Sequence, residues 1–183
     1  MRRPSQHITA RRTRESLRAG RDAYRFAPLN VLLTIVFEVE PQREFDPQRY
    51  VSCFVGRFRS WLAYRREKGA CSSPPVWHLV FERGASLHAH LSMHVPSQLM
   101  DDFRRTYPKW QDRDLAGTRI VVTPITNTNG LLRYLHKGVD PHQAHRFDIR
   151  PSPQGAIWGP RVRASRSLGP SARERRRIAA LSS

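Results

Sequence analysis

Cysteine and long apolar runs are scarce in this chain of 183 residues. The two cysteines, Cys53 and Cys71, are too few for a disulfide framework or for a zinc site built from cysteines. No apolar run has the length of a signal-peptide core or of a membrane span, so we expect a cytoplasmic protein without a membrane partner. The pattern Gly-x-x-x-x-Gly-Lys-Ser/Thr does not occur, which argues against a P-loop motor within the sequence.

Acidic residues and lysines are also few. There are 15 Asp and Glu against 32 Lys and Arg, and the net charge is +17. Only three of the basic residues are lysines: Lys68, Lys109 and Lys137. Such an excess of positive charge on a small domain indicates a polyanionic partner, with nucleic acid ahead of an acidic membrane surface.

The apolar pattern predicts one α+β domain. Short β-branched or alternating stretches predict strands, whereas apolar residues three and four apart predict helices. The expected order is β-α-β-β-α-β-α, a ferredoxin-like or RRM-like layout with a four-stranded antiparallel sheet. We expect its helices on one face and its active site on the other. The strands are expected at 31–38, 76–82, 87–95 and 119–125, and the helices at 46–69, 96–107 and 128–138.

Basic segments flank this predicted domain. We expect a basic N-terminal arm over residues 1–27, the folded domain over 28–150 and a basic extension over 151–183. The Arg- and Ser-containing N-terminal stretch also has features of a transit peptide, but Glu15 and Asp22 disfavour that interpretation.

Alternating histidines mark the third predicted strand. If Leu87–Val95 is extended, His88 and His90 lie on one face, where both imidazoles can reach one divalent ion. Glu82, on the preceding strand, is placed to be a third ligand. Imidazole and carboxylate ligands with open positions suit a catalytic Mg²⁺ or Mn²⁺. His94 lies about 13 Å from His90 along an ideal strand, too far to share the ion, and we expect it on the sheet surface or against DNA.

Two residues of the last predicted helix suggest a nucleophile. Tyr134 and Lys137 are three residues apart and share a helix face. The ammonium can therefore stabilise negative charge on the phenolate or on a pentavalent phosphate. The alternative for Tyr134 is a core aromatic beside Leu131 and Leu135. His136 points about 100° away from its neighbours on a helix, which predicts a side chain facing solvent or DNA.

These motifs resemble those of the HUH endonuclease superfamily. Val31–Phe37 is similar to the family's first strand motif, His88 and His90 to its metal-binding pair, Glu82 to its acidic ligand, and Tyr134–Lys137 to its Tyr-x-x-Lys motif. The resemblance implies that residues 28–150 form a metal-dependent nickase. Its tyrosine would cut single-stranded DNA at an origin hairpin, remain on the 5′ phosphate and free a 3′ hydroxyl. As a rolling-circle replication initiator of a plasmid or filamentous-type phage, it would need a separate host helicase and polymerase.

Other interpretations stay open. Gly138 stands where phage-type initiators often carry a second tyrosine, and relaxases place their tyrosine before the histidines. A single-strand transposase of the same superfamily would use the same residues. A non-catalytic RRM-like protein would instead need aromatic residues on the exposed sheet face, where this sequence places His88 and His90. The tryptophans are candidate base-stacking platforms or core residues: Trp61, Trp77, Trp110 and Trp158.

Overall fold

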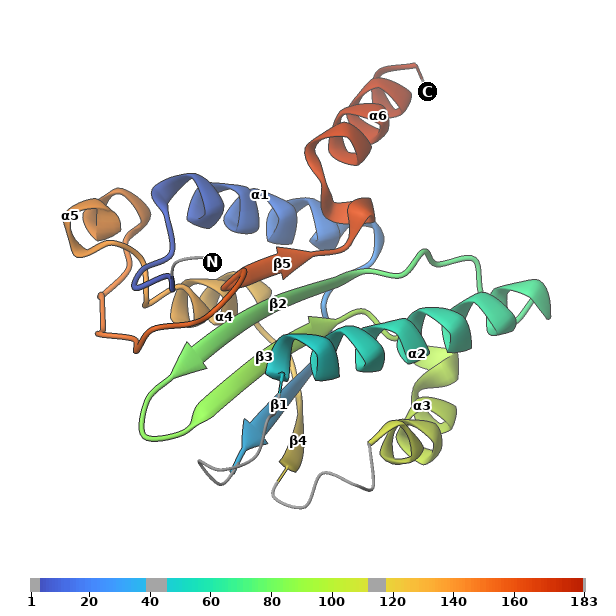
Figure 1. Ribbon diagram of the computed structural model, residues 1–183. Helices are drawn as coiled ribbons and strands as arrows, with labels where there is room; N and C mark the ends of the chain where they lie inside the picture. Colours follow the sequence, from blue (N-terminus) through green and yellow to red (C-terminus); the bar gives the residue numbers. More distant parts are fainter. Residues whose placement is uncertain (1–3, 39–45, 112–117, 183) are drawn as a thin grey trace.

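A five-stranded antiparallel sheet organises the computed structural model, which describes residues 4–38, 46–111 and 118–182 (Figure 1). The strand order is β4-β1-β3-β2-β5. Four strands form where the sequence predicts them, and a fifth short strand adds to the edge beside β2, so the expected count of four is wrong. The strands are β1 (Val31–Phe37), β2 (Trp77–Arg83), β3 (Leu87–Met93), β4 (Thr118–Pro124) and β5 (Val162–Ala164).

One face of the sheet forms the main hydrophobic core, covered by α2 (Pro47–Glu67) and α3 (Met100–Thr106). Asp46 begins α2 as predicted, because its carboxylate accepts hydrogen bonds from the amides of Gln48 and Arg49. Gly69 follows the helix with φ of 71°, a conformation that favours glycine. Alternate residues of the strands pack against aromatic side chains of these helices, including Phe54, Phe58 and Phe103. Short 3-10 turns flank α3 at Ser97–Leu99 and Tyr107–Trp110.

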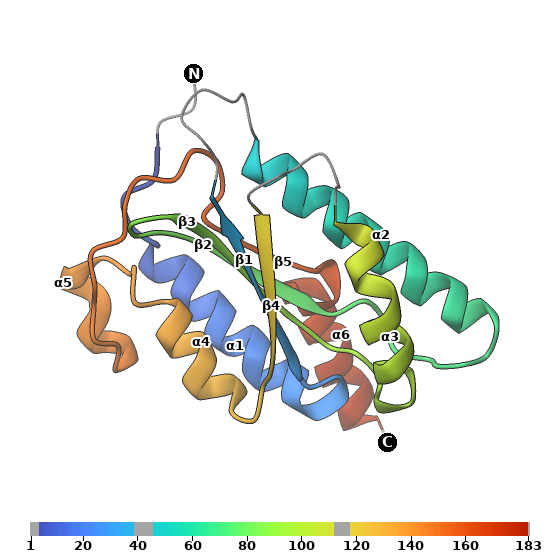
Figure 2. The ribbon, with the colours of Figure 1, turned by 90° about the horizontal axis from the view of Figure 1, so that it is seen from below.

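Two further helices cover the opposite face, so the prediction that helices lie on one face only is wrong. They are α1 (Ala10–Phe26) and α4 (Thr128–Leu135), and Figure 2 shows the sheet between the two helical layers. The predicted N-terminal arm is thus largely a helix. Its packed side carries mostly small residues, and Gly20 lies so close to Leu132 that a Cβ atom there would clash.

The segment after residue 138 contains further helices and a strand. It contains α5 (Pro141–Ala144), 3-10 turns at His145–Phe147 and Arg166–Leu168, the strand β5, and α6 (Pro170–Leu181). Two ion pairs join α6 to α1: Arg173 with Glu15, and Arg176 with Asp22. No helix in the described part of the chain is long and apolar enough to cross a membrane.

Candidate active site

The sheet register places the predicted metal ligands in neighbouring rows on the face that α1 and α4 cover. Glu82 pairs with His88 across β2 and β3, and His88 pairs with Val36 of β1. In the next row His90 pairs with Thr34. The apolar alternates of β3 fill the main core on the other face, so the alternation predicted for this strand is confirmed.

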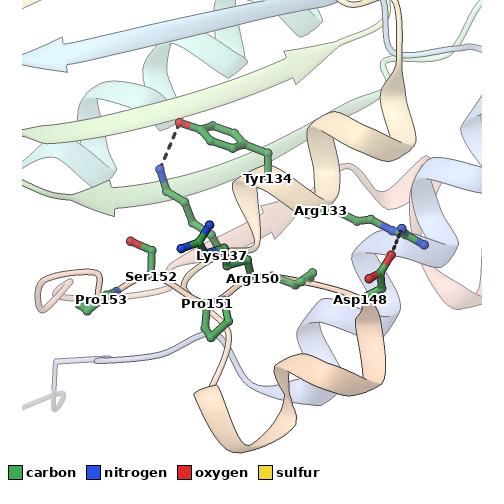
Figure 3. A pocket seen from close by; sticks show the side chains of 9 residues that line it. Arg133, Tyr134, Lys137, Asp148, Arg150, Pro151, Ser152 and Pro153 are labelled. Atoms are coloured by element: carbon green, nitrogen blue, oxygen red, sulfur yellow. Dashed lines mark hydrogen bonds and ion pairs between the residues drawn. The ribbon is translucent and has the colours of Figure 1, made fainter.

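The proposed nucleophile projects from α4 over this face. Asn127 begins the helix by accepting a hydrogen bond from the amide of Gly130. Tyr134 is 58% exposed, which excludes the alternative of a core aromatic. The Lys137 ammonium donates a hydrogen bond to the Tyr134 hydroxyl over 3.2 Å and lies 4.3 Å from the centre of the phenol ring (Figure 3).

A chain of polar contacts connects the tyrosine to the sheet. The ammonium of Lys137 also lies 2.9 Å from one carboxylate oxygen of Glu82. The other carboxylate oxygen lies 3.4 Å from Nε2 of His90, whose Nδ1 is 3.2 Å from the Thr34 hydroxyl. Because Nε2 faces a carboxylate, the natural tautomer carries its proton on Nε2 and accepts a hydrogen bond from Thr34 at Nδ1.

These polar contacts determine the charges at the site. The pKa of Glu82 is lowered to about 2 because His90 and Lys137 hydrogen bond to the carboxylate, against the opposing effect of burial. Burial lowers the pKa of Lys137, but hydrogen bonds to Glu82 and Tyr134 outweigh it and raise the pKa overall. At neutral pH the site therefore holds a carboxylate beside an ammonium, and an ammonium can stabilise negative charge but cannot accept a proton.

The remaining predicted ligand, His88, lies beside His90 with 5.9 Å between the ring centres. Its Nε2 contacts the hydroxyl of Ser86 over 2.8 Å. Burial is the largest effect on His88 and lowers its pKa, which favours the neutral imidazole that a metal requires. Across the described residues, no three His, Cys, Asp or Glu side chains are grouped closely enough to hold a metal ion.

Two buried histidines lie under α4, and the prediction that His136 faces solvent or DNA is wrong. The helix ends at Leu135, so His136 turns inward and is 0% exposed, with Nδ1 3.2 Å from the Thr13 hydroxyl. Its ring lies 5.5 Å from that of His78, whose Nε2 is 2.9 Å from the Ser16 hydroxyl. Burial lowers the pKa of His78 to about 4; burial, with a smaller effect of His78, also lowers that of His136. This neutral pair attaches the end of α4 to α1 and β2.

His94 has a structural role. It follows the end of β3, and its Nδ1 donates a hydrogen bond to the carbonyl of Pro28 over 2.8 Å. Burial lowers the pKa of His94 despite this hydrogen bond. The residue thus ties the end of β3 to the connection that precedes β1.

A hollow of about 490 Å³ opens beside the tyrosine (Figure 3). Arg133 and Arg150 line it, and Arg133 forms a 2.8 Å ion pair with Asp148. Residues 148–153 also line the hollow. The amide of Ser152 donates a hydrogen bond to the carbonyl of Lys137, and this bond holds the segment next to the end of α4. Guanidinium groups and a hydroxyl beside an exposed phenol suit an incoming phosphodiester.

Several of these side chains escaped prediction as site residues. Thr34 is the one polar residue in the apolar run of β1, and an isolated hydroxyl in such a run can indicate a site residue. His78 precedes Val80 and Glu82 at the same spacing of two, which places all three on one face of β2. Thr13 and Ser16 gave no signal, because their segment is dominated by arginine.

No family model, curated protein or solved structure matches this chain, so the functional conclusion depends on the residues of the site themselves.

Proposed function

We propose that this protein is a metal-dependent endonuclease that nicks single-stranded DNA through Tyr134, in the manner of an HUH rolling-circle replication initiator. The observation that carries the proposal is the continuous set of contacts from the Tyr134 hydroxyl through Lys137 and Glu82 to His90. An exposed phenol held by an ammonium, above a carboxylate and imidazoles, is an arrangement suited to phosphoryl transfer.

The proposed step is an exchange of phosphate esters. The Tyr134 oxygen attacks the phosphorus, a bond forms between them, and the bond from phosphorus to the 3′ oxygen breaks. The phenol gives its proton to solvent, and the departing 3′ oxygen takes one up to become a free hydroxyl. The ammonium of Lys137, 3.2 Å from the phenol oxygen, stabilises the negative charge that develops there.

The donor set fits Mg²⁺ or Mn²⁺ in its chemistry. Glu82, His88 and His90 provide one carboxylate and two imidazoles from adjacent strands, and Glu82 already holds a cation in the form of Lys137. An ion bound at Nε2 of His88 would replace the contact of that nitrogen with the Ser86 hydroxyl. The metal would act as a Lewis acid on a phosphate oxygen. The Thr34 hydroxyl can hydrogen bond to Nδ1 of His90 with or without a metal on Nε2, because a hydroxyl both donates and accepts hydrogen bonds.

A stripe of arginines on α1 supports a nucleic-acid substrate. Successive members are three or four residues apart, so they lie on one helix face, and all are exposed. They span about 21 Å along the axis, at 1.5 Å per residue. The helix that carries them packs against α4 through its opposite, buried side. The stripe consists of Arg11, Arg14, Arg18, Arg21 and Arg25.

We further propose that β1 to β4 form a ferredoxin-like unit to which β5 and the outer helices are added. The order β4-β1-β3-β2, with α2 and α3 as the connecting helices, supports this assignment. Such a unit exposes its two central strands to α4, which is where the proposed site lies.

The rival functions make different demands on the same face. An RRM-like protein stacks bases on aromatic side chains of the central strands. Here β1 and β3 present Leu32, Thr34 and Val36, and His88, His90 and Ser92, so this rival lacks its platform. A transposase would use the same site but would join the cut ends. The proposed nickase instead leaves a 3′ hydroxyl for a separate polymerase and helicase in the cytoplasm.

The test uses a pool of single-stranded DNA with a randomised centre and a label at the 3′ end, incubated with the full chain and Mn²⁺. The proposal predicts a labelled protein–DNA adduct that survives denaturing electrophoresis. Tyr134→Phe should abolish it, because the phenol oxygen is the nucleophile, and EDTA should abolish it, because the metal polarises the phosphate.

The matched control is Tyr24→Phe, which removes the hydroxyl of another exposed tyrosine, 74% exposed on α1. This variant should form adducts as the wild type does. An adduct that persists in Tyr134→Phe would refute the nucleophile assignment, and an adduct indifferent to EDTA would refute the metal.

A further inference from the structure

One tryptophan differs from the other three in its exposure. Trp61, Trp77 and Trp110 lie in the main core and are 8–9% exposed, whereas Trp158 is 64% exposed. Leaving a side chain of this size in water forgoes the stabilisation that burial would give it. The exposed indole is therefore free to present its aromatic face to a ligand.

The backbone that carries Trp158 is fixed on both sides. The preceding residue, Ile157, is 3% exposed and exchanges two backbone hydrogen bonds with Ser5. The side-chain amide of Gln48 donates to the carbonyls of Trp158 and Pro160, over 3.3 and 3.1 Å. Gly159 has φ of 87°, a turn conformation that glycine adopts without strain. The indole is thus displayed on a rigid support, which reduces the entropy cost of binding.

A hollow of about 330 Å³ lies beside the indole. Its apolar lining includes Phe81 and Leu87, and its cationic lining is the exposed guanidinium of Arg83. Asp46 also lines it, but its carboxylate accepts hydrogen bonds from the first amides of α2. The volume is at the lower end of the range of about 300–1,000 Å³ seen for small-ligand sites.

A short segment connects this hollow to the tyrosine site. Arg83 directly follows Glu82, and its carbonyl accepts a hydrogen bond from the amide of Gly155 over 2.7 Å. Three residues earlier, the amide of Ser152 bonds the carbonyl of Lys137. From Ser152 to Trp158 the chain can span at most about 22 Å. In Figure 1 this stretch runs between α5 and β5, along the sheet edge.

We propose that Trp158 is a stacking platform for an unpaired nucleobase, with Arg83 holding the adjacent phosphate of single-stranded DNA. This rests on the proposed function for the identity of the strand and extends it by a second contact on the same DNA. The net charge of +17 favours a polyanion here. A single strand offers a base to the aromatic face and a phosphate to the guanidinium beside it.

The test measures binding without cleavage. The full chain carrying Tyr134→Phe is titrated in EDTA with end-labelled single-stranded oligothymidine. Tryptophan fluorescence is recorded, and the anisotropy of the label gives the affinity, also for variants that lack Trp158. Because the other three tryptophans are buried, quenching reports on Trp158. Trp158→Ala should remove the quenching and weaken binding about tenfold, and Trp158→Phe should keep most of the affinity. An oligonucleotide backbone without bases should bind weakly and equally to wild type and Trp158→Ala.

The matched control is Tyr64→Ala, which removes another aromatic, 51% exposed on α2, and should leave the affinity unchanged. Equal affinity for wild type and Trp158→Ala, or burial of the indole by self-association without DNA, would overturn the proposal. The adduct assay separates the two claims. If adducts form but Trp158→Ala leaves the affinity unchanged, only the stacking role of Trp158 is refuted. If DNA quenches the fluorescence but no adduct forms, only the nickase proposal is refuted.

Discussion

The two faces of the same sheet are built from different chemistry. Toward α2 and α3, the strands present almost only apolar side chains, which join aromatic residues in one large cluster. Toward α1 and α4, the same strands present His78, Glu82, His88, His90 and Ser92. Several buried atoms there have no hydrogen-bond partner among the described residues, including Nδ1 of His78 and the hydroxyl of Ser92.

This contrast separates stability from function. Apolar burial is the main stabilising contribution to a fold, and the α2 face provides most of it. Burying polar groups that lack hydrogen-bond partners lowers the free energy of unfolding, and such groups are often kept because they have a function. We therefore expect substitutions on the first face to change the free energy of unfolding, and substitutions on the second to change pH dependence and activity.

The largest effect on stability is expected from Phe58→Ala. Phe58 is 0% exposed and contacts the rings of Trp61, Phe103 and Trp110. The truncation should lower the free energy of unfolding by about 3–5 kcal/mol in a urea titration. Ser92→Ala is the comparison on the other face. It removes a buried hydroxyl that has no partner among the described residues, so it should be neutral or slightly stabilising. Equal losses in the two variants would contradict the contrast.

The buried histidine pair should make the fold sensitive to acid. Burial lowers the pKa of His78 from the ordinary histidine value of 6.5 to about 4, so the unfolded chain binds the proton more readily than the folded one. The free energy of unfolding should therefore fall as the pH drops from 6.5 toward 4, by about 3 kcal/mol from this residue.

His78→Gln keeps a polar group near Ser16 and should flatten the slope in that pH window. Urea titrations at a series of pH values measure it. The exposed His142, changed to Gln, should leave the slope as it is. A slope unaffected by His78→Gln would show that this face does not control the acid response.

On activity, Lys137→Met should reduce adduct formation about 100-fold, because it removes a charged donor at the reacting oxygen. Lys68→Met is the matched control. Lys68 also lies over a tyrosine ring, 5.7 Å from the centre of Tyr64, on the far side of the sheet. Adduct yield under single-turnover conditions should be normal in Lys68→Met. Normal yield in both variants would exclude an electrostatic role for Lys137.

The smallest effect is expected from Thr34→Val, which preserves shape but leaves Nδ1 of His90 without its partner. Loss of such a supporting contact typically lowers metal affinity or activity about tenfold. The Mn²⁺ concentration for half-maximal adduct formation should rise accordingly. Thr123→Val, on the exposed edge of the same face, should leave it unchanged. A rise in both variants, or in neither, would remove Thr34 from the site.

The elements that could be predicted from the sequence are those whose signals are strong and local. The β-branched run of β1, the alternation in β3 and the cap at Asp46 each confine the backbone by themselves. The helix α1 was missed because its packed side has small residues in place of a large apolar stripe. The strand β5 was missed because three residues beside β2 carry no periodicity of their own.

The site shows the same division. Spacing alone put Tyr134 beside Lys137, and strand alternation put His88 and His90 on one face. The contact between Lys137 and Glu82 depends on how α4 crosses the sheet, which no local pattern encodes. His136 was misplaced because the predicted helix runs to Gly138, whereas the observed helix ends at Leu135.

The most direct test of the central claim is mass spectrometry of the adduct formed with wild-type protein. After digestion with nuclease and trypsin, which cleaves beyond Arg133 and Lys137, the peptide Tyr134-Leu-His-Lys137 should carry a 5′-linked nucleotide on its tyrosine. A nucleotide on any other residue, or no modified peptide under conditions that cut the DNA, would contradict the assignment of Tyr134 as the nucleophile.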